Sequence, residues 1–188
     1  MNDSAHFAEY TVEKKYEGAY GRKRVLAIIL YILAPIVLLL LLLSNPYTGA
    51  IAILIFIPLA PTFFLFVVRT TYGRYFKIEY EYRVATGEMV IAEVYNKKSR
   101  KDIFTVTLAN AETIAPYRDE YKEACDKESY DRIVDSVSSM SSPDVYFLTV
   151  PDEDDRSKKT LVFFEPTAKM LRLLSLYNRK TVVDKVRY

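Results

Sequence analysis

A long window without charge is the feature of this sequence that most constrains its fold. All 50 Lys, Arg, Asp and Glu side chains lie outside residues 25–68, the stretch between Arg24 and Arg69. The mean hydropathy of 0.00 is therefore an average over two unlike parts, one apolar and one rich in charge. This division excludes a wholly soluble single domain, a disordered chain and a disulfide-stapled secreted module.

The charge-free window is long enough to cross a membrane twice. Residues 25–43 and 50–68 are each 19 uncharged residues, and the first ends in six consecutive leucines. At about 1.5 Å per helical residue, each reaches roughly 28 Å, close to the ~30 Å thickness of the hydrocarbon core. Residues 44–49, Ser-Asn-Pro-Tyr-Thr-Gly, are turn formers. We predict two transmembrane helices over 25–43 and 50–68, joined by an extracytoplasmic turn over 44–49.

Basic residues flank the two predicted spans on one side only. The turn between the spans has none, and the flanking cations are Lys14, Lys15, Arg22, Lys23, Arg24, Arg69, Arg74, Lys77 and Arg83. The positive-inside rule therefore predicts a multi-pass protein of the cell membrane with both termini in the cytoplasm. Residues 1–24 would form a cytoplasmic N-terminal arm, and residues 69–188 a cytoplasmic domain with 21 basic and 20 acidic side chains.

The first part of the cytoplasmic domain alternates like an antiparallel sheet. Residues 76–84, F-K-I-E-Y-E-Y-R-V, place apolar and charged side chains on opposite faces, as a half-buried strand does. Thr86-Gly87 predicts a turn, residues 88–95 a second strand and residues 96–101 a further turn. Residues 104–108 predict a third strand, so the simplest fold is a three-stranded meander.

The second part of the domain has weaker patterns. We predict a short helix near 118–126, and strands over 145–150 and 160–164. Residues 130–136 fit either a helix or a strand. A final helix is predicted with Pro166 in its first turn and Asn178 at its end. Its apolar stripe, which would pack on the sheet, comprises Met170, Leu171, Leu173, Leu174 and Tyr177.

The order of elements resembles the pleckstrin-homology (PH) superfold. The whole chain is similar to a small family of uncharacterised bacterial membrane proteins, of the low-GC Gram-positive type, that place a PH-like domain after a two-helix hairpin. The motifs that carry the resemblance are Glu79–Tyr82, Thr86-Gly87-Glu88, residues 96–101, residues 114–117 and Phe164-Glu165-Pro166. The resemblance implies an α+β fold: a transmembrane hairpin followed by a PH-like antiparallel β domain closed by a C-terminal helix. It also implies a strand over 130–136, and it supplies no known catalytic or ligand-binding residues to carry over to this chain.

Residues that carry catalysis are scarce. His6 is the only histidine and lies in the predicted arm, which excludes His-based acid–base chemistry and multi-histidine metal sites. Cys125 is the only cysteine, and a packing role is favoured because no histidine partner activates it. Residues 152–155, Asp-Glu-Asp-Asp, lack the spacing and the glycine of a calcium loop, so they indicate a solvated turn. We therefore expect no enzymatic activity, no cofactor and no metal.

One basic patch is a candidate binding site. It consists of Lys97, Lys98, Arg100 and Lys101. Near an anionic leaflet each cation would gain about 1 kcal/mol, so the patch is a candidate for binding lipid headgroups or a protein partner. The alternative is a solvated turn with no ligand. Nucleic acid is excluded as a partner because the domain is nearly neutral and its aromatic residues alternate into a sheet.

Two functions compete. The first is a non-enzymatic integral membrane protein whose PH-like domain binds a protein partner or anionic lipid headgroups. The alternative is an accessory subunit of a larger membrane complex of transport or envelope type, with contacts made through the spans. The sequence does not specify the partner or the oligomeric state.

Overall fold

The computed structural model describes residues 6–44, 49, 54, 58–59, 61–62, 64–66, 77–152, 155 and 157–186. The chain divides into two units, which are described separately. Met1–Lys14 and Glu79–Tyr188 form one unit, here called the β-domain, and Lys15–Ile78 form the other, here called the helical segment. The predicted turn over 44–49 and the predicted second span over 50–68 fall almost wholly outside the described residues.

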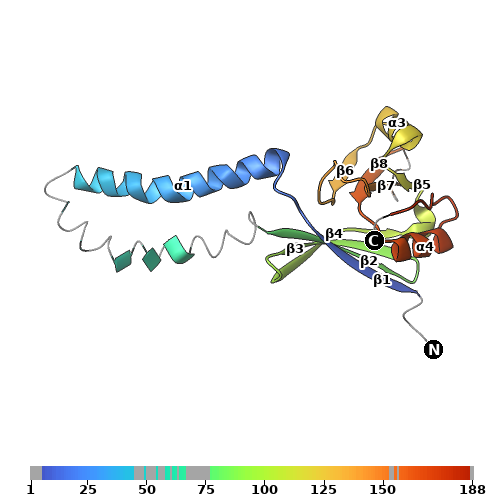
Figure 1. Ribbon diagram of the computed structural model, residues 1–188, viewed down its shortest axis with the longest axis horizontal. Coiled ribbons are helices and arrows are strands. Elements are labelled where there is room, and N and C mark those ends of the chain that lie inside the picture. Colours follow the sequence, from blue (N-terminus) through green and yellow to red (C-terminus); the bar gives the residue numbers. More distant parts are fainter. Residues whose placement is uncertain are drawn as a thin grey trace. The chain divides into compact units, whose positions relative to one another are not determined.

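Helix α1, Gly18–Leu43, contains the predicted first span (Figure 1). Among the described residues it is the one helix long and apolar enough to cross a membrane. The helix begins seven residues before Val25, so two polar turns with Arg22, Lys23 and Arg24 precede the apolar stretch. Most of the described large apolar side chains from Val25 onward are exposed, as in a helix that could cross a membrane.

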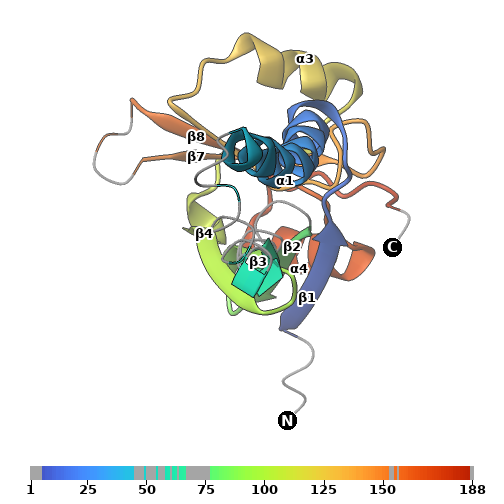
Figure 2. The same cartoon turned by 90° about the vertical axis from the view of Figure 1, so that its left-hand side faces the viewer.

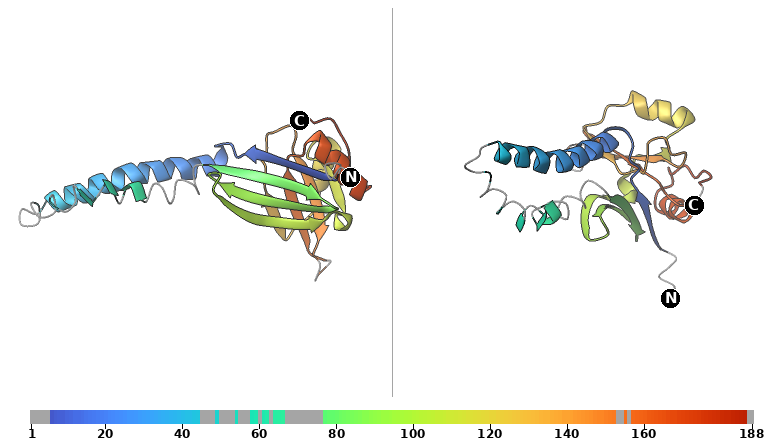
Figure 3. Two further views of the ribbon diagram at one scale, coloured as in Figure 1. Left: turned by 90° about the horizontal axis from the view of Figure 1, so that it is seen from below. Right: turned by 60° about the vertical axis from the view of Figure 1, so that its left-hand side comes forward.

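Four antiparallel strands form sheet A of the β-domain. They are β1 (Phe7–Glu13), β2 (Ile78–Ala85), β3 (Glu88–Tyr95) and β4 (Ser99–Thr107). Each strand neighbours the next in the order β1-β2-β3-β4 (Figure 3). In the pairing of β1 with β2, Phe7 lies opposite Ala85 and Glu13 lies opposite Glu79. The sheet therefore combines a strand that precedes the helical segment with three strands that follow it.

Strand β1 differs from the predicted N-terminal arm over residues 1–24. Ala8 and Val12 are 3% and 6% exposed and face the core, and Tyr10 between them lies beside the Tyr82 ring at a centroid distance of 6.5 Å. The alternating neighbours Glu9 and Thr11 are exposed. The apolar pattern of β1 covers only seven residues and includes the small residue Ala8. Its pairing partner, β2, lies beyond the helical segment, so the local sequence does not indicate a strand.

Strand β2 matches the predicted alternation, and β3 has the bounds predicted for the second strand. Tyr80, Tyr82 and Val84 are buried, and the charged residues between them lie on the other face. Thr86 and Gly87 join the two strands with φ values of 47° and 86°, as in a type I′ turn. A Cβ at Gly87 would lie 3.2 Å from the Tyr177 ring, so this position favours glycine both by conformation and by space.

Strand β4 begins earlier than predicted. The turn predicted over 96–101 is shorter: β3 ends at Tyr95 and β4 begins at Ser99. Asn96 and Lys97 have φ values of 50° and 56°, and the Lys98 N–H donates to the Tyr95 carbonyl at 3.0 Å. A type I′ turn with two central residues reverses the chain within this length, so Arg100 and Lys101 belong to the strand.

Four further strands form sheet B. They are β5 (Thr113–Pro116), β6 (Arg132–Asp135), β7 (Tyr146–Pro151) and β8 (Lys159–Phe164), in the order β5-β7-β8-β6. The 3₁₀ helix η2 (Leu108–Asn110) leads into β5, and α3 (Asp119–Lys127) confirms the predicted short helix. β7 pairs antiparallel with β5 and with β8, whereas β6 pairs parallel with β8.

The ambiguous stretch over 130–136 contains strand β6, as the family resemblance implies. Ile133 lies opposite Leu161 and Val134 lies opposite Val162. Val134 is 8% exposed and faces the core, whereas its neighbours Ile133 and Asp135 are exposed, as side chains on the opposite face of a strand are. The helical spacing of its apolar residues is overridden by this pairing with a strand distant in sequence.

Helix α4, Ala168–Tyr177, carries the predicted apolar stripe. Its buried side chains are Met170, Leu171, Leu173 and Leu174. The helix contacts β1, and the two elements lie side by side in Figure 2. Its N-cap is Thr167, whose side chain accepts from the Met170 N–H at 3.3 Å. Pro166 therefore precedes the cap and is not in the first turn as predicted, because the threonine hydroxyl satisfies a free N–H of that turn.

Candidate membrane-facing interface

The β3–β4 turn contains the first two cations of the predicted patch. Lys97 and Lys98 are exposed at its tip. No hydrogen bond or ion pair joins either side chain to another described residue. Their polar neighbours Asn96 and Ser99 complete a convex turn, and its backbone is fixed by the Lys98-to-Tyr95 hydrogen bond. The turn therefore holds two adjacent positive charges in solvent.

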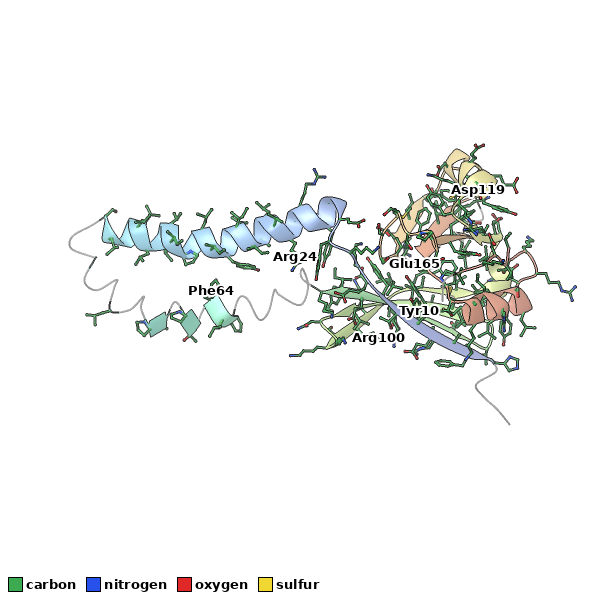
Figure 4. The ribbon with its side chains drawn as sticks, viewed as in Figure 1. Tyr10, Arg24, Phe64, Arg100, Asp119 and Glu165 are labelled. Atoms are coloured by element: carbon green, nitrogen blue, oxygen red, sulfur yellow. The ribbon has the colours of Figure 1, made fainter. Side chains whose placement is uncertain are left out.

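Arg100 is engaged by the sheet itself (Figure 4). Its Nη1 lies 2.5 Å from Glu81 Oε1 on β2, and its Nε lies 3.2 Å from Asp102 Oδ1. Glu81 also accepts from Arg83 Nη2 at 3.3 Å, and its side chain is 14% exposed. Arg100 thus belongs to an ion-pair network on the outer face of sheet A, where its charge is largely compensated.

Lys101 points to the opposite face from Arg100 because strand residues alternate. It lies directly opposite Glu93 on β3. Glu93 also accepts a hydrogen bond from the Tyr95 hydroxyl. An opposite charge across a strand pair offsets part of the charge of Lys101. The four predicted cations are therefore split: two form an exposed tip and two face carboxylates of the sheet.

The helical segment leaves and rejoins the β-domain at this same end of sheet A. β1 ends at Glu13, opposite Glu79 near the start of β2. β2 and β3 each have eight residues and are joined by a two-residue turn, so β3 ends where β2 begins. The β3–β4 turn therefore lies at the end of the sheet where the chain enters and leaves the helical segment.

Lys14 is bound by the β-domain at this end. Its Nζ donates to the Tyr80 hydroxyl at 2.8 Å and lies 3.7 Å from Asp135 Oδ2. Burial, with the nearby carboxylates of Asp135 and Glu93, raises the pKa of Tyr80 far above its ordinary value. The lysine therefore faces a neutral phenol and a carboxylate, which fixes the point where the chain leaves β1. From the sequence, Lys14 is predicted only as one of the cations that flank the spans.

The start of α1 carries an aromatic and cationic stack. The rings of Tyr16 and Tyr20 are stacked with centroids 5.9 Å apart, and the Arg24 guanidinium lies 3.6 Å from the centre of the Tyr16 ring. Tyrosine and arginine side chains have an apolar body and a polar tip. Such side chains suit the headgroup layer, where the apolar body can be buried and the polar tip stays in water. These residues precede Val25, where the apolar stretch begins.

Cys125 and His6 lie in ordinary structural environments. Cys125 is 3% exposed in an apolar cluster, and burial raises the pKa of its thiol. The Tyr130 hydroxyl donates to its Sγ at 3.8 Å. His6 lies next to β1, with its Nδ1 3.1 Å from the Tyr177 hydroxyl. A thiol with a raised pKa is a poor nucleophile, which favours the packing role predicted for Cys125.

The acidic turn over 152–155 is described only in part, because Glu153 and Asp154 lie outside the described residues. Asp155 accepts from the Ser157 N–H at 3.1 Å and from its hydroxyl at 2.6 Å, and these bonds lower the pKa of the carboxyl. Within the described part of the chain, no three His, Cys, Asp or Glu side chains gather to hold a metal ion.

A buried carboxylate, that of Glu165 in the Phe164-Glu165-Pro166 motif, organises the serine-rich loop after β6. Glu165 is 9% exposed (Figure 4) and accepts from the Ser138 N–H at 2.6 Å and from the Ser142 hydroxyl at 3.3 Å. The Tyr82 hydroxyl donates to the Ser136 carbonyl in the same region. These bonds fasten the loop to the core, so Glu165 has a structural role.

The fold defines the class of protein. An antiparallel four-stranded sheet, a second sheet and a closing C-terminal helix make the chain α+β and its β-domain PH-like. The chain belongs to the family described as bacterial PH-like domain (DUF6106), whose sequence model matches residues 2–184. The match includes β1, α1 and the strands after the helical segment. No curated protein and no solved structure matches the chain.

Proposed function

We propose that this protein is a non-enzymatic membrane protein that holds its PH-like β-domain against the cytoplasmic face of the cell membrane as an interaction module. The anchor is a two-span hairpin, with α1 as the first span and residues 50–68 as the second. Both termini lie in the cytoplasm. Support for an interaction module comes from the PH-like family and from the cations exposed next to the anchor.

The pairing of Glu13 with Glu79 carries the proposal. β1 and β2 belong to one sheet, so they fold on the same side of the membrane. A single crossing by α1 would place β1 and β2 on opposite sides and prevent this pairing. This pairing supports an even number of crossings within the helical segment. The uncharged residues 50–68 are long enough for the second crossing.

A short connection keeps the β-domain close to the bilayer. Only residues 15–17 separate Lys14 from α1. The seven residues of α1 before Val25 add about 10 Å at the helical rise. Cations on both sides of the hairpin orient this end toward the cytoplasm. The domain is therefore tethered within reach of the headgroups.

The environments of the reactive side chains support the non-enzymatic part of the proposal. Cys125 is packed in the core, with the pKa of its thiol raised by burial. His6, the only histidine, lies beside a tyrosine hydroxyl at the opposite end of β1 from the anchor. The Cys125 thiol therefore has no histidine base beside it, and the contact between His6 and the Tyr177 hydroxyl lies exposed at the surface.

Cysteine accessibility in intact cells tests the proposed anchor. In a Cys125→Ala background, single cysteines are introduced as Ser4→Cys, Thr48→Cys or Ser99→Cys and treated with a membrane-impermeant maleimide. We expect labelling of Thr48→Cys from outside, and labelling of the other two only after permeabilisation. Labelling of Ser4→Cys and Ser99→Cys from opposite sides would contradict the even number of crossings, and labelling of both from outside would contradict the cytoplasmic location.

A further inference from the structure

We propose that Lys97 and Lys98 contact the anionic lipid headgroups of the leaflet that holds the anchor, and that Arg100 and Lys101 do not. The inference rests on the proposed function and specifies the ligand of its interaction module. The ligand is the negatively charged bilayer surface itself.

The position of the turn brings it to the membrane. It lies at the end of sheet A where β1 ends and β2 begins, which are the two points joined to the helical segment. Neighbouring strands are about 4.8 Å apart, so the turn is displaced from the start of β2 by roughly two strand spacings. This displacement is comparable to the Debye length of about 8 Å at physiological salt.

The two lysines are available for a ligand. Both are exposed, and neither side chain has a hydrogen bond or ion pair with another described residue. The type I′ turn holds them in place, with Lys97 at a φ of 56°. A fixed backbone presents both ammonium groups on one convex tip at little further cost in backbone ordering.

The other two cations differ from the tip in their surroundings: Arg100 forms ion pairs with the sheet, and Lys101 lies across from a carboxylate on β3. Arg100 lies 2.5 Å from Glu81 and 3.2 Å from Asp102. Moving Arg100 to a phosphate would break both contacts and leave the 14%-exposed Glu81 carboxylate with one partner fewer. Lys101 lies opposite Glu93 on the other face of the strand. The carboxylates of Glu81, Asp102 and Glu93 therefore offset part of these two charges, which lowers their contribution to the field at the tip.

A bilayer suits this tip better than a protein does. Protein interfaces obtain most of their affinity from a few buried aromatic or arginine anchors surrounded by apolar contacts. The turn has none: its residues are Asn96, Lys97, Lys98 and Ser99. Attraction of lysines to an anionic leaflet needs no buried anchor residue. The membrane anchor also keeps the β-domain at a high local concentration beside the lipid headgroups.

The experiment uses the full chain in nanodiscs. An environment-sensitive fluorophore is attached at Ser99→Cys in the Cys125→Ala background, and a quencher is carried on lipid headgroups. In phosphatidylglycerol-containing discs we expect strong quenching that falls with added salt, and in phosphatidylcholine discs we expect weak quenching. Equal quenching in the two lipids, or quenching insensitive to salt, would overturn the proposal.

Two pairs of adjacent cations provide the matched variants. Lys97→Gln with Lys98→Gln is expected to reduce the ratio of docked to undocked domain in anionic discs by roughly 30-fold, which corresponds to about 1 kcal/mol for each lysine. Arg179→Gln with Lys180→Gln removes the same charge from the exposed segment after α4 and is expected to leave quenching unchanged. Equal losses in the two pairs would show a response to net charge alone and would overturn the assignment.

Arg100→Gln separates binding from folding. We expect it to lower the midpoint of chemical unfolding and, below that midpoint, to retain the quenching in anionic discs. If Arg100→Gln instead abolishes the quenching in anionic discs and leaves the unfolding midpoint unchanged, Arg100 contacts the lipid headgroups. That result would overturn the proposal that it does not. If the maleimide labelling is as expected and the lipid-dependent quenching is absent, the proposed anchor is supported and the proposed lipid contact is wrong. The turn would then be a candidate for binding an acidic protein partner.

Discussion

Asn178→Asp is expected to lower the free energy of unfolding of the β-domain by about 3 kcal/mol at neutral pH. The Asn178 side chain is 6% exposed and connects the end of α4 to the end of sheet A. Its Nδ2 donates to the Leu108 carbonyl at 2.8 Å and to the Ala111 carbonyl at 2.7 Å, and its Oδ1 accepts from the Lys180 N–H at 2.9 Å. A carboxylate keeps only the last of these bonds.

The destabilisation combines two effects. The Leu108 and Ala111 carbonyls lose their shared donor, and a buried carboxylate oxygen then faces two carbonyl oxygens. Unfolding of the full chain in detergent, followed by near-ultraviolet circular dichroism of the buried tyrosines, measures the change. The control is Asn110→Asp, the same chemical change at an exposed residue of η2, with an expected effect within about 0.5 kcal/mol. Equal effects of the two substitutions would contradict the role given to Asn178.

Val12→Asn is expected to destabilise the β-domain by a similar amount, about 3 kcal/mol. Val12 lies on β1 opposite Tyr80 and is 6% exposed, so the substitution removes a buried apolar side chain and introduces an amide at the core face. An amide without partners there adds its desolvation cost to the lost apolar burial. The same unfolding measurement applies.

Thr11→Asn is the matched control for Val12. Thr11 is the preceding residue of β1 and points to the exposed face. We expect a change within about 0.5 kcal/mol, because the amide stays in water. A free N-terminal arm would tolerate both substitutions equally, and that result would contradict the assignment of residues 7–13 to sheet A.

Elements decided by local pattern were predictable from the sequence. The charge-free stretch from Val25 gave α1, and the alternation around Tyr80 and Tyr82 gave β2 and, after Thr86-Gly87, β3. In each case the residues that define the element are contiguous, and one face or the whole segment is apolar. Periodicity alone then determines the type of element.

Elements decided by distant pairing were not predictable in the same way. β1 pairs with a strand on the far side of the helical segment, and its inward residues Ala8, Tyr10 and Val12 form a short, mixed pattern. β6 pairs in parallel with β8, and only the family resemblance favoured a strand there. These contacts depend on tertiary structure, which a window of sequence does not contain.

The four cations of the candidate site were predicted as one group, but the fold separates them into a pair in the turn and a pair on β4. Lys97, Lys98, Arg100 and Lys101 are close in sequence, but the connection between β3 and β4 covers only residues 96–98 and places only the first two cations at the tip. Alternation along β4 then directs Arg100 to Glu81 and Lys101 to the face of Glu93. The length of the turn determines this division, because the turn predicted over 96–101 would have contained all four cations.

A protein without the helical segment tests the central claim, that β1 completes a PH-like domain interrupted by a membrane anchor. Glu13 lies opposite Glu79, so Lys14 can be joined to Ile78 by a two-residue Asn-Gly turn. We predict that this joined chain is soluble and unfolds cooperatively in urea, whereas residues 78–188 alone do not. Equal cooperative unfolding of the two chains, with the same midpoint, would contradict the claim.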